Sequence, residues 1–312
     1  MMMTQNKTAR PETWSHTVRK HARNSPWITT GMALSLLVIL VLVAQSVVQL
    51  LSEDSSSIVR YALIGGAAGL GATALGALPA LVFRRVPQKI EDAMLGMAAG
   101  MMLAATAFSL FLPGIEAGGK ILGSKTGGAG LVVLGMALGV LLMLGLDEFT
   151  PHEHEKTGQF GVGHERYGRI WLFVFAIALH NLPEGMAIGV GFSQGDMSVG
   201  IPLTAAIALQ DLPEGLAVAI ALRSIGFPAW KAVLIAASTG LLEPLGALLG
   251  VGLSSGFAVA YPIGLGLAGG AMLFVVSHEV IPETHRNGHQ TPATIGLMAG
   301  FALMMVLDTT LG

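Results

Sequence analysis

Residues 126–146 read TGGAGLVVLGMALGVLLMLGL, a stretch without a single charged side chain. An α-helix rises about 1.5 Å per residue, so about 20 apolar residues cross the hydrocarbon core of a bilayer. Three further stretches reach this length without a charge: Trp27–Leu51, Tyr61–Phe83 and Ala93–Ile115. The sequence therefore predicts an all-α, polytopic membrane protein.

The composition favours the same fold class. Hydrophobic residues make up 53% of the 312 residues and charged residues only 12%, against about a quarter in soluble domains. The 42 glycines suit helices that pack backbone to backbone in lipid. Cysteine is absent, which excludes disulfides and thiolate metal sites. The formal net charge is −2, and we expect no nucleic-acid partner.

Five more apolar stretches carry polar groups within them or at their ends. They are Ile170–Gln194, Val199–Leu222, Ala232–Leu253, Ala258–Ile281 and Thr291–Leu307. Nine spans place the two termini on opposite sides of the membrane. With the N-terminus in the cytoplasm, 14 of the 17 basic residues fall on the inner side, and the positive-inside rule selects this orientation.

These spans divide the chain into three parts. We predict a cytoplasmic N-terminal segment (1–26), an additional N-terminal transmembrane helix (27–51) and an eight-helix core (58–312). The first span is too long for a secretory signal peptide, and no small-residue cleavage pattern follows it. A polar cytoplasmic loop at 147–169 either holds metal loosely through its histidines or is simply solvated. Those histidines are His152, His154 and His164.

Two adjacent spans carry the same polar motif near their centres. Residues 180–185 read HNLPEG and residues 210–215 read QDLPEG, and the next span has Glu243-Pro244 near its own centre. In each motif the first polar residue lies four positions before the glutamate, so both share one helix face. The proline of each motif cannot donate to the helix ladder, so the helix can kink there. The side chains that could bind metal are His180, Asn181, Glu184, Gln210, Asp211, Glu214 and Glu243.

Four of these side chains are carboxylates at one depth, near the bilayer midplane. Each costs about 2.5–3.5 kcal/mol to insert. Their sum, on the order of 10 kcal/mol, rivals the whole stability of a typical domain, about 5–15 kcal/mol. No lysine or arginine lies at that depth to pair with them. Either the group is partly protonated or cations bind there, and two divalent ions would neutralise four carboxylates.

The types of side chain indicate which metal would bind. Imidazole with carboxylate and amide oxygens suits zinc, cadmium, iron or manganese, whereas magnesium and calcium prefer all-oxygen sites. Met102, near the centre of the third span, either adds a thioether or fills the core like other methionines. We therefore predict a site for a divalent transition metal, with zinc first among the candidates.

Two other classes of function compete with metal transport. An intramembrane metalloprotease needs H-E-x-x-H on one helix, and neither the stretch from His180 nor that from His278 provides it. A proton channel, or a proton-coupled carrier of an organic substrate, explains buried acids but not the paired histidine and glutamate rows. We expect a transporter and not an enzyme.

HNLPEG and QDLPEG, followed by EPLG at 243–246 and SHEVIPE at 277–283, resemble motifs of the ZIP (Zrt-, Irt-like) family of metal-ion transporters. The resemblance extends from about Tyr61 to the C-terminus and is closest to bacterial zinc-transporting members with an additional N-terminal span. It implies eight core helices, a homodimer and a binuclear site that passes Zn²⁺ towards the cytoplasm, with Cd²⁺ able to substitute. By resemblance, the first ion is held by Met102, His180, Glu184, Gln210 and Glu214. The second is held by Asn181, Asp211, Glu214 and Glu243, with Glu214 bridging.

Further polar residues lie near the ends of the predicted spans. Glu116 and Asp308 would form an acidic outer mouth. By resemblance, the inner exit route would pass Asp147, His278 and Glu279. Helix ends are normally polar, so each of these residues could equally be a solvated end. We expect a multi-pass protein of the cell membrane, the inner membrane in a Gram-negative bacterium, with its N-terminus in the cytoplasm.

Overall fold

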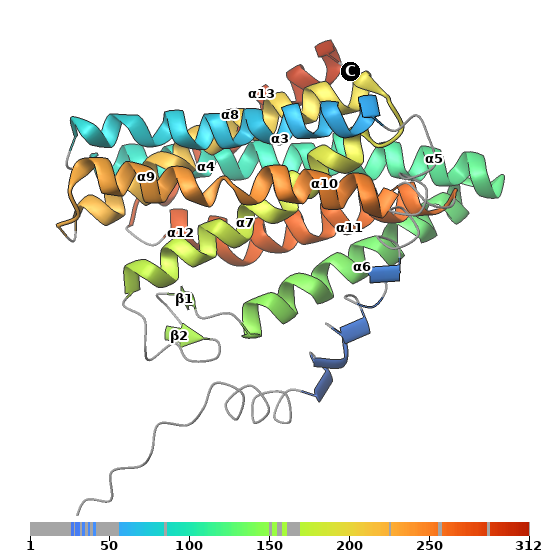
Figure 1. Cartoon of the computed structure of the whole chain (residues 1–312), viewed down its shortest axis with the longest axis horizontal. Coiled ribbons are helices and arrows are strands. Elements are labelled where there is room, and N and C mark those ends of the chain that lie inside the picture. Colours follow the sequence, from blue (N-terminus) through green and yellow to red (C-terminus); the bar gives the residue numbers. More distant parts are fainter. Residues whose placement is uncertain are drawn as a thin grey trace, which may run out of the picture.

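The computed structural model describes residues 26–27, 29–31, 33–34, 37, 40–41, 56–83, 86–149, 152–154, 158–160, 169–224, 226–254, 258–285 and 288–311. Long helices lie side by side through this part of the chain (Figure 1). Its only strands are β1 (His152–His154) and β2 (Gly158–Phe160), which pair antiparallel with His152 opposite Phe160. The predicted all-α fold class is confirmed.

Several predicted spans are uninterrupted helices. These are α3 (Ser56–Ala77, extended by the 3₁₀ turn Leu78–Leu81), α6 (Lys125–Phe149), α7 (Arg169–Phe192), α8 (Met197–Ser224) and α13 (Gln290–Leu311). Helices α7 and α8 run on through the prolines of the two motifs. The prolines thus remove single ladder hydrogen bonds without ending either helix.

The other three spans are interrupted. Their parts are α4 (Gln88–Ala105), a π-helical segment (Thr106–Phe111) and α5 (Leu112–Leu122); α9 (Ala229–Thr239) and α10 (Leu242–Ser254); and α11 (Ala260–Val275), a π-helical segment (Val276–Val280) and α12 (Ile281–Thr284). Such irregularities inside helices often occur at functional sites. The sequence predicted none of the three as a break.

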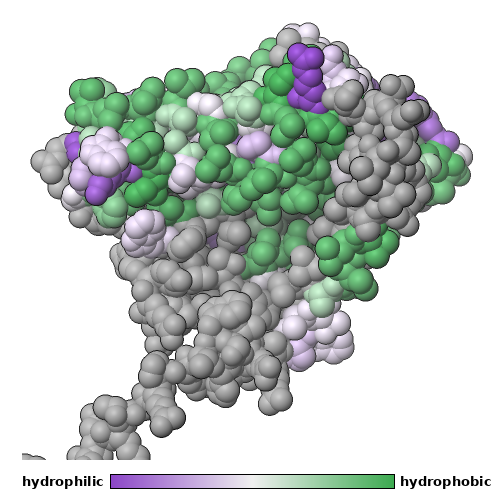
Figure 2. Space-filling model, viewed as in Figure 1, coloured by the Kyte–Doolittle hydropathy of each residue, from purple (hydrophilic) through white to green (hydrophobic). Residues whose placement is uncertain are grey.

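Seven helical segments in the described part of the chain are long and apolar enough to cross a membrane. They correspond to the predicted spans other than the first and the fifth, and the fifth coincides with the 24-residue helix α7. The first predicted span, 27–51, lies largely outside the described residues, so the count of nine stays a prediction. Figure 2 shows hydrophobic side chains over the middle of the bundle and hydrophilic ones towards its ends.

Glycines divide the helices into two groups by their packing. An added β-carbon would collide with the backbone of a neighbouring helix at many glycines, and all of these contacts fall within one group or the other. The site bundle comprises α3, α7, α8, α9 and α10. The flanking bundle comprises α4, α5, α6, α11, α12 and α13. Within the flanking bundle, for example, Gly100 lies against the carbonyl of Leu297, and Gly139 against that of Leu267.

Two contacts fix the direction of helices α4 and α13. Near the start of both helices, His289 Nδ1 lies 2.8 Å from Asp92 Oδ2. Towards their other ends, the hydroxyl of Ser109 donates a hydrogen bond of 2.6 Å to Asp308 Oδ1. The two helices therefore run parallel, as the predicted topology requires of its third and ninth spans.

Candidate metal centre

Four carboxylic side chains are buried inside the site bundle. Glu184 comes from α7, Asp211 and Glu214 from α8, and Glu243 from α10, and none is more than 2% exposed. The motif spacing explains this arrangement, because residues three and four apart on a helix point to the same side. The face predicted for each motif is thus the face that the helices bury.

Glu184, Asp211 and Glu214 each have one carboxylate oxygen that lies within 4.8 Å of those of the other two. Two oxygens that bind one zinc ion at about 2.0–2.2 Å can be at most about 4.4 Å apart. The limit on the observed spacing is thus about 0.4 Å larger than that of a zinc coordination shell. The cluster combines residues from two helices, so it depends on how α7 and α8 pack.

Most oxygens of this cluster lack a hydrogen-bond donor. Both carboxylate oxygens of Asp211 and of Glu214 are buried without a partner, as is Oε2 of both Glu184 and Glu243. A buried anion without a partner costs several kcal/mol, so such groups are normally paired or bound to metal. The orphaned oxygens fit a group of divalent cations, and the donor set of carboxylates, amides and imidazole suits zinc.

Gln210 connects the two motifs. Its Nε2 donates a hydrogen bond of 2.6 Å to Oε1 of Glu184, which leaves the amide oxygen of Gln210 as a buried acceptor without a partner. The side chains that the two motifs place at their first and fifth positions thus meet across the α7–α8 contact. This amide can hold Glu184 in place and still offer its oxygen to a cation.

Glu243 reaches the site through a break in its span. Gly240 and Leu241 form a turn between α9 and α10, and Glu243 lies in the first turn of α10. Carboxylates are favoured there because the free N–H groups of a helix start carry partial positive charge. Thr73 on α3 donates a hydrogen bond of 3.1 Å to Glu243 Oε1. Neither the break nor the role of Thr73 was predicted, and the contact of Thr73 joins segments far apart in the sequence.

The glycines of the two motifs bring the helices of the site together. A β-carbon at Gly185 would collide with the carbonyl oxygen of Glu243, and one at Gly215 with the carbonyl oxygen of Thr73. Each motif therefore supplies a glutamate for the site and, next to it, a contact surface for a neighbouring helix. This explains in physical terms why glycine follows glutamate in both motifs.

Comparison with known proteins agrees with this geometry. The model of a family described as "ZIP Zinc transporter" matches residues 151–308. The chain is 63% identical to zinc transporter ZIPB of Bordetella bronchiseptica over 291 residues, which cover 93% of this chain and 94% of the relative. The chain belongs to the ZIP family. It is also 42% identical to zinc transporter GufA of Myxococcus xanthus, over 77% of this chain and 95% of that protein. It is 28% identical to human zinc transporter ZIP11, over 82% and 98%.

Three further residues were predicted at the site. His180 and Asn181 are buried on α7, one turn before Glu184, at 4% and 1% exposure. The Nδ2 atom of Asn181 has no hydrogen-bond partner. Met102 is fully buried on α4, so it belongs to the flanking bundle, whereas the other predicted ligands belong to the site bundle.

The predicted entrance and exit residues of this ZIP protein lie apart from the cluster. Glu116 is exposed on α5, while half-buried Asp308 accepts the hydrogen bond from Ser109. His278 is exposed in a π-helical segment with its ring 4.9 Å from that of Phe274, and Glu279 beside it is half-buried. The side chains of four predicted residues lie outside the described part of the structure: Asp147, His152, His154 and His164.

Proposed function

We propose that this chain carries zinc across the membrane towards the cytoplasm through a binuclear site in the site bundle. The observation that carries this proposal is the cluster of buried carboxylates whose oxygens lack donors. The cluster lies among helices apolar enough to cross a bilayer. ZIPB and GufA, two relatives of this chain, are named zinc transporters, which favours zinc among the metals that these ligands suit.

The proposed ligands divide into two sets that share one carboxylate. Glu214 lies one turn from Gln210 and three residues from Asp211, so it can face both ions. Two dications balance the four carboxylates, which explains how so many acids are tolerated away from water. The first ion would be held by Met102, His180, Glu184, Gln210 and Glu214. The second would be held by Asn181, Asp211, Glu214 and Glu243. Cadmium prefers similar ligands and would substitute for zinc.

We further propose that the ions move with the site bundle as it slides against the flanking bundle. All helix-to-helix backbone contacts at glycine lie inside the two bundles, whereas the one glycine contact between them, at Gly264, meets the side chains of Ser254 and Val190. Bodies that pack tightly inside and more loosely against each other can shift by small sliding steps. Every proposed ligand except Met102 would travel with the site bundle, so Met102 would leave the first ion during the step.

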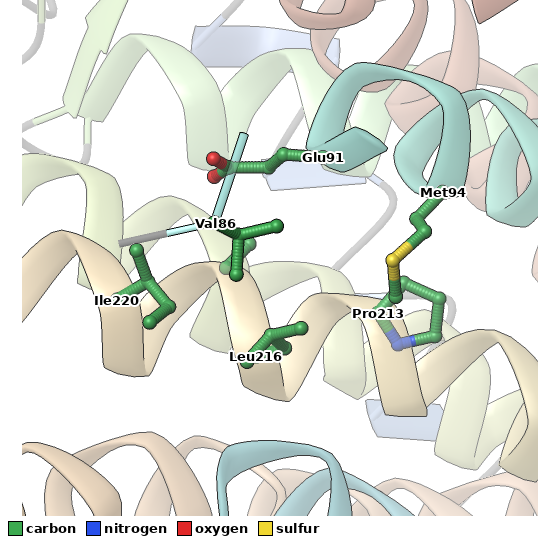
Figure 3. A pocket seen from close by; sticks show the side chains of 7 residues that line it. Val86, Glu91, Met94, Pro213, Leu216 and Ile220 are labelled. Atoms are coloured by element: carbon green, nitrogen blue, oxygen red, sulfur yellow. The ribbon is translucent and has the colours of Figure 1, made fainter. Parts of the chain in front are cut away.

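The contact between the bundles contains a pocket. It opens between the start of α4 and the second half of α8, and its lining is mostly apolar (Figure 3). The carboxylate of Glu91 projects towards it from α4, and Pro213 borders it from α8, next to Glu214. Incomplete packing at this contact favours relative movement, because a well-packed interface resists displacement.

Uptake into liposomes by the purified protein tests the proposed function. We expect zinc and cadmium to enter and magnesium and calcium to be excluded. Transport of none of these ions by protein that binds zinc would contradict the proposal. Metal-dependent proteolysis would favour the protease alternative, and proton flux without metal would favour the proton channel.

A cross-link tests the sliding step. The chain has no cysteine, so Met94→Cys with Leu216→Cys introduces two thiols that line the pocket from opposite bundles. A short thiol-specific cross-linker should stop uptake, and cleaving a reducible linker should restore it. The single-cysteine variants serve as controls. Full uptake in completely cross-linked protein would contradict movement at this contact. We also propose that the protein is a homodimer of the cell membrane, the inner membrane in a Gram-negative bacterium. The ZIP resemblance favours the dimer, and the charge distribution favours a cytoplasmic N-terminus.

A further inference from the structure

Helix α3 supplies none of the ligands expected from the motifs, yet it borders Glu243 on two sides. Thr73 and Gly69 lie one turn apart on this helix and so share a face. The Thr73 hydroxyl lies 3.1 Å from Glu243 Oε1 and 3.3 Å from the carbonyl oxygen of Gly69. A β-carbon at Gly69 would collide with Glu243 Oε2 and lie 3.1 Å from Asp211 Oδ2. The Thr73 hydroxyl therefore contacts Oε1 of Glu243, and Gly69, which has no side chain, leaves space for Oε2.

We propose that Thr73 and Gly69 define the subsite of the second ion by making Glu243 a one-oxygen ligand. This inference rests on the proposed binuclear site. The hydrogen bond from Thr73 occupies Oε1, and Gly69 leaves room for Oε2 beside the carboxylate of Asp211. Oε2 of Glu243 and both oxygens of Asp211 are the atoms that lack a donor. Thr73 is thus a positioning residue, and Glu243 binds the second ion through Oε2.

The position of Thr73 is itself fixed from two helices. A β-carbon at Gly215, the residue after Glu214, would collide with the carbonyl oxygen of Thr73. The Cβ of Thr73 would be 3.1 Å from a β-carbon at Gly240, in the turn before α10. Thr73 is only 2% exposed, so its hydroxyl is shielded from bulk solvent. The distance between Glu243 and the α8 carboxylates is therefore set through α3 and not only through α10.

The Thr73 hydroxyl has one proton and two possible acceptors, Glu243 Oε1 and the carbonyl oxygen of Gly69. A threonine in a helix commonly bonds the carbonyl four residues earlier, which here is that of Gly69. A hydrogen bond to an ionised carboxylate is about twice as strong as one to a neutral acceptor. The hydroxyl also lies nearer Glu243 than Gly69. We therefore expect it to donate to Glu243 whenever that carboxylate is ionised and holds metal.

Zinc titration of the purified full-length protein tests this role. Thr73→Val keeps the branched shape but removes the donor, and removing such a partner of a metal ligand typically weakens binding about 10- to 100-fold. We expect the affinity for the second zinc ion to fall by that factor and the affinity for the first to stay unchanged. Thr73→Ser keeps the hydroxyl and should restore the second affinity. A merely structural role would change both affinities alike or neither, and serine would not restore one selectively.

Gly69→Ala provides an independent variant, because its β-carbon would displace Glu243 Oε2. The matched control is Gly71→Ala on the same helix, where a β-carbon has no atom within 4 Å. We expect the second ion to be lost in Gly69→Ala and kept in Gly71→Ala. If the parent binds two zinc ions and neither Thr73→Val nor Gly69→Ala alters the second, the role of α3 is wrong. If the parent itself binds only one ion, the binuclear proposal fails instead.

Discussion

Replacing Gly185 by alanine should weaken zinc binding although it changes no ligand side chain. A β-carbon there would collide with the carbonyl oxygen of Glu243 and lie 2.7 Å from its Cα and 2.8 Å from its carbonyl carbon. Carbon atoms in contact prefer about 3.5–4.0 Å, so α7 and α10 must separate by about 1 Å. Backbone atoms cannot rotate away, and overpacking of this kind typically costs about 1–3 kcal/mol. The separation also moves Glu243 away from Glu184, which lies next to the substituted residue.

We expect Gly185→Ala to bind zinc about 10- to 100-fold more weakly and to unfold roughly 5 °C lower. Both are measured on protein purified in detergent, by zinc titration and by thermal unfolding without metal. The control is Gly130→Ala, an equal change in α6 where a β-carbon has no atom within 4 Å. If Gly185→Ala matches Gly130→Ala in zinc affinity and unfolding temperature, the glycine does not set the spacing of the site.

Three further predictions concern topology, the cytoplasmic loop and pH. Single cysteines at Ser56 and at Gly158 should react with impermeant thiol reagents from opposite sides, the latter from the cytoplasm; labelling of both from one side would rule out the predicted topology. Changing the three loop histidines, His152, His154 and His164, to alanine should leave both bound zinc ions in place. Loss of the zinc ions would mean that the loop belongs to the site. Zinc competes with protons for the buried histidine and carboxylates, so its affinity should fall as the pH drops from 7 to about 5. An affinity that stays constant over this range would argue against His180 as a ligand.

Local spacing in the sequence was enough to predict much of the site. The separation of His180 from Glu184, and of Gln210 from Glu214, assigns each pair to one helix face without knowledge of the fold. The structure buries these faces against each other, and Gln210 donates to Glu184 across the contact. Apolar length alone likewise located the helices, because the bilayer sets a minimum span.

Other features were not predicted, and most of them depend on packing between distant segments. The turn at Gly240 does have a local cause: Pro244 lacks the N–H that would bond the Gly240 carbonyl, which accepts from Glu243 instead. The contacts that Glu243 then makes with α7 and Thr73 could not be read from the sequence. In the sequence, Thr73 is a single threonine in an apolar helix, and its role follows only from its contact with Glu243 of α10. Pro183 and Pro213, which were expected to allow kinks, lie inside α7 and α8, and neither helix ends there. The interruption near the site is instead at Gly240.

The number of zinc ions bound per protomer tests the shared-ligand site most directly. The purified parent should bind about two. Glu214→Ala should bind almost none and lose transport, because neither ligand set is complete without the bridging carboxylate and three acids remain for two dications. Glu243→Ala should keep about one, since Glu243 serves only the second ion. Glu214→Ala protein that still binds two zinc ions per protomer would contradict the account.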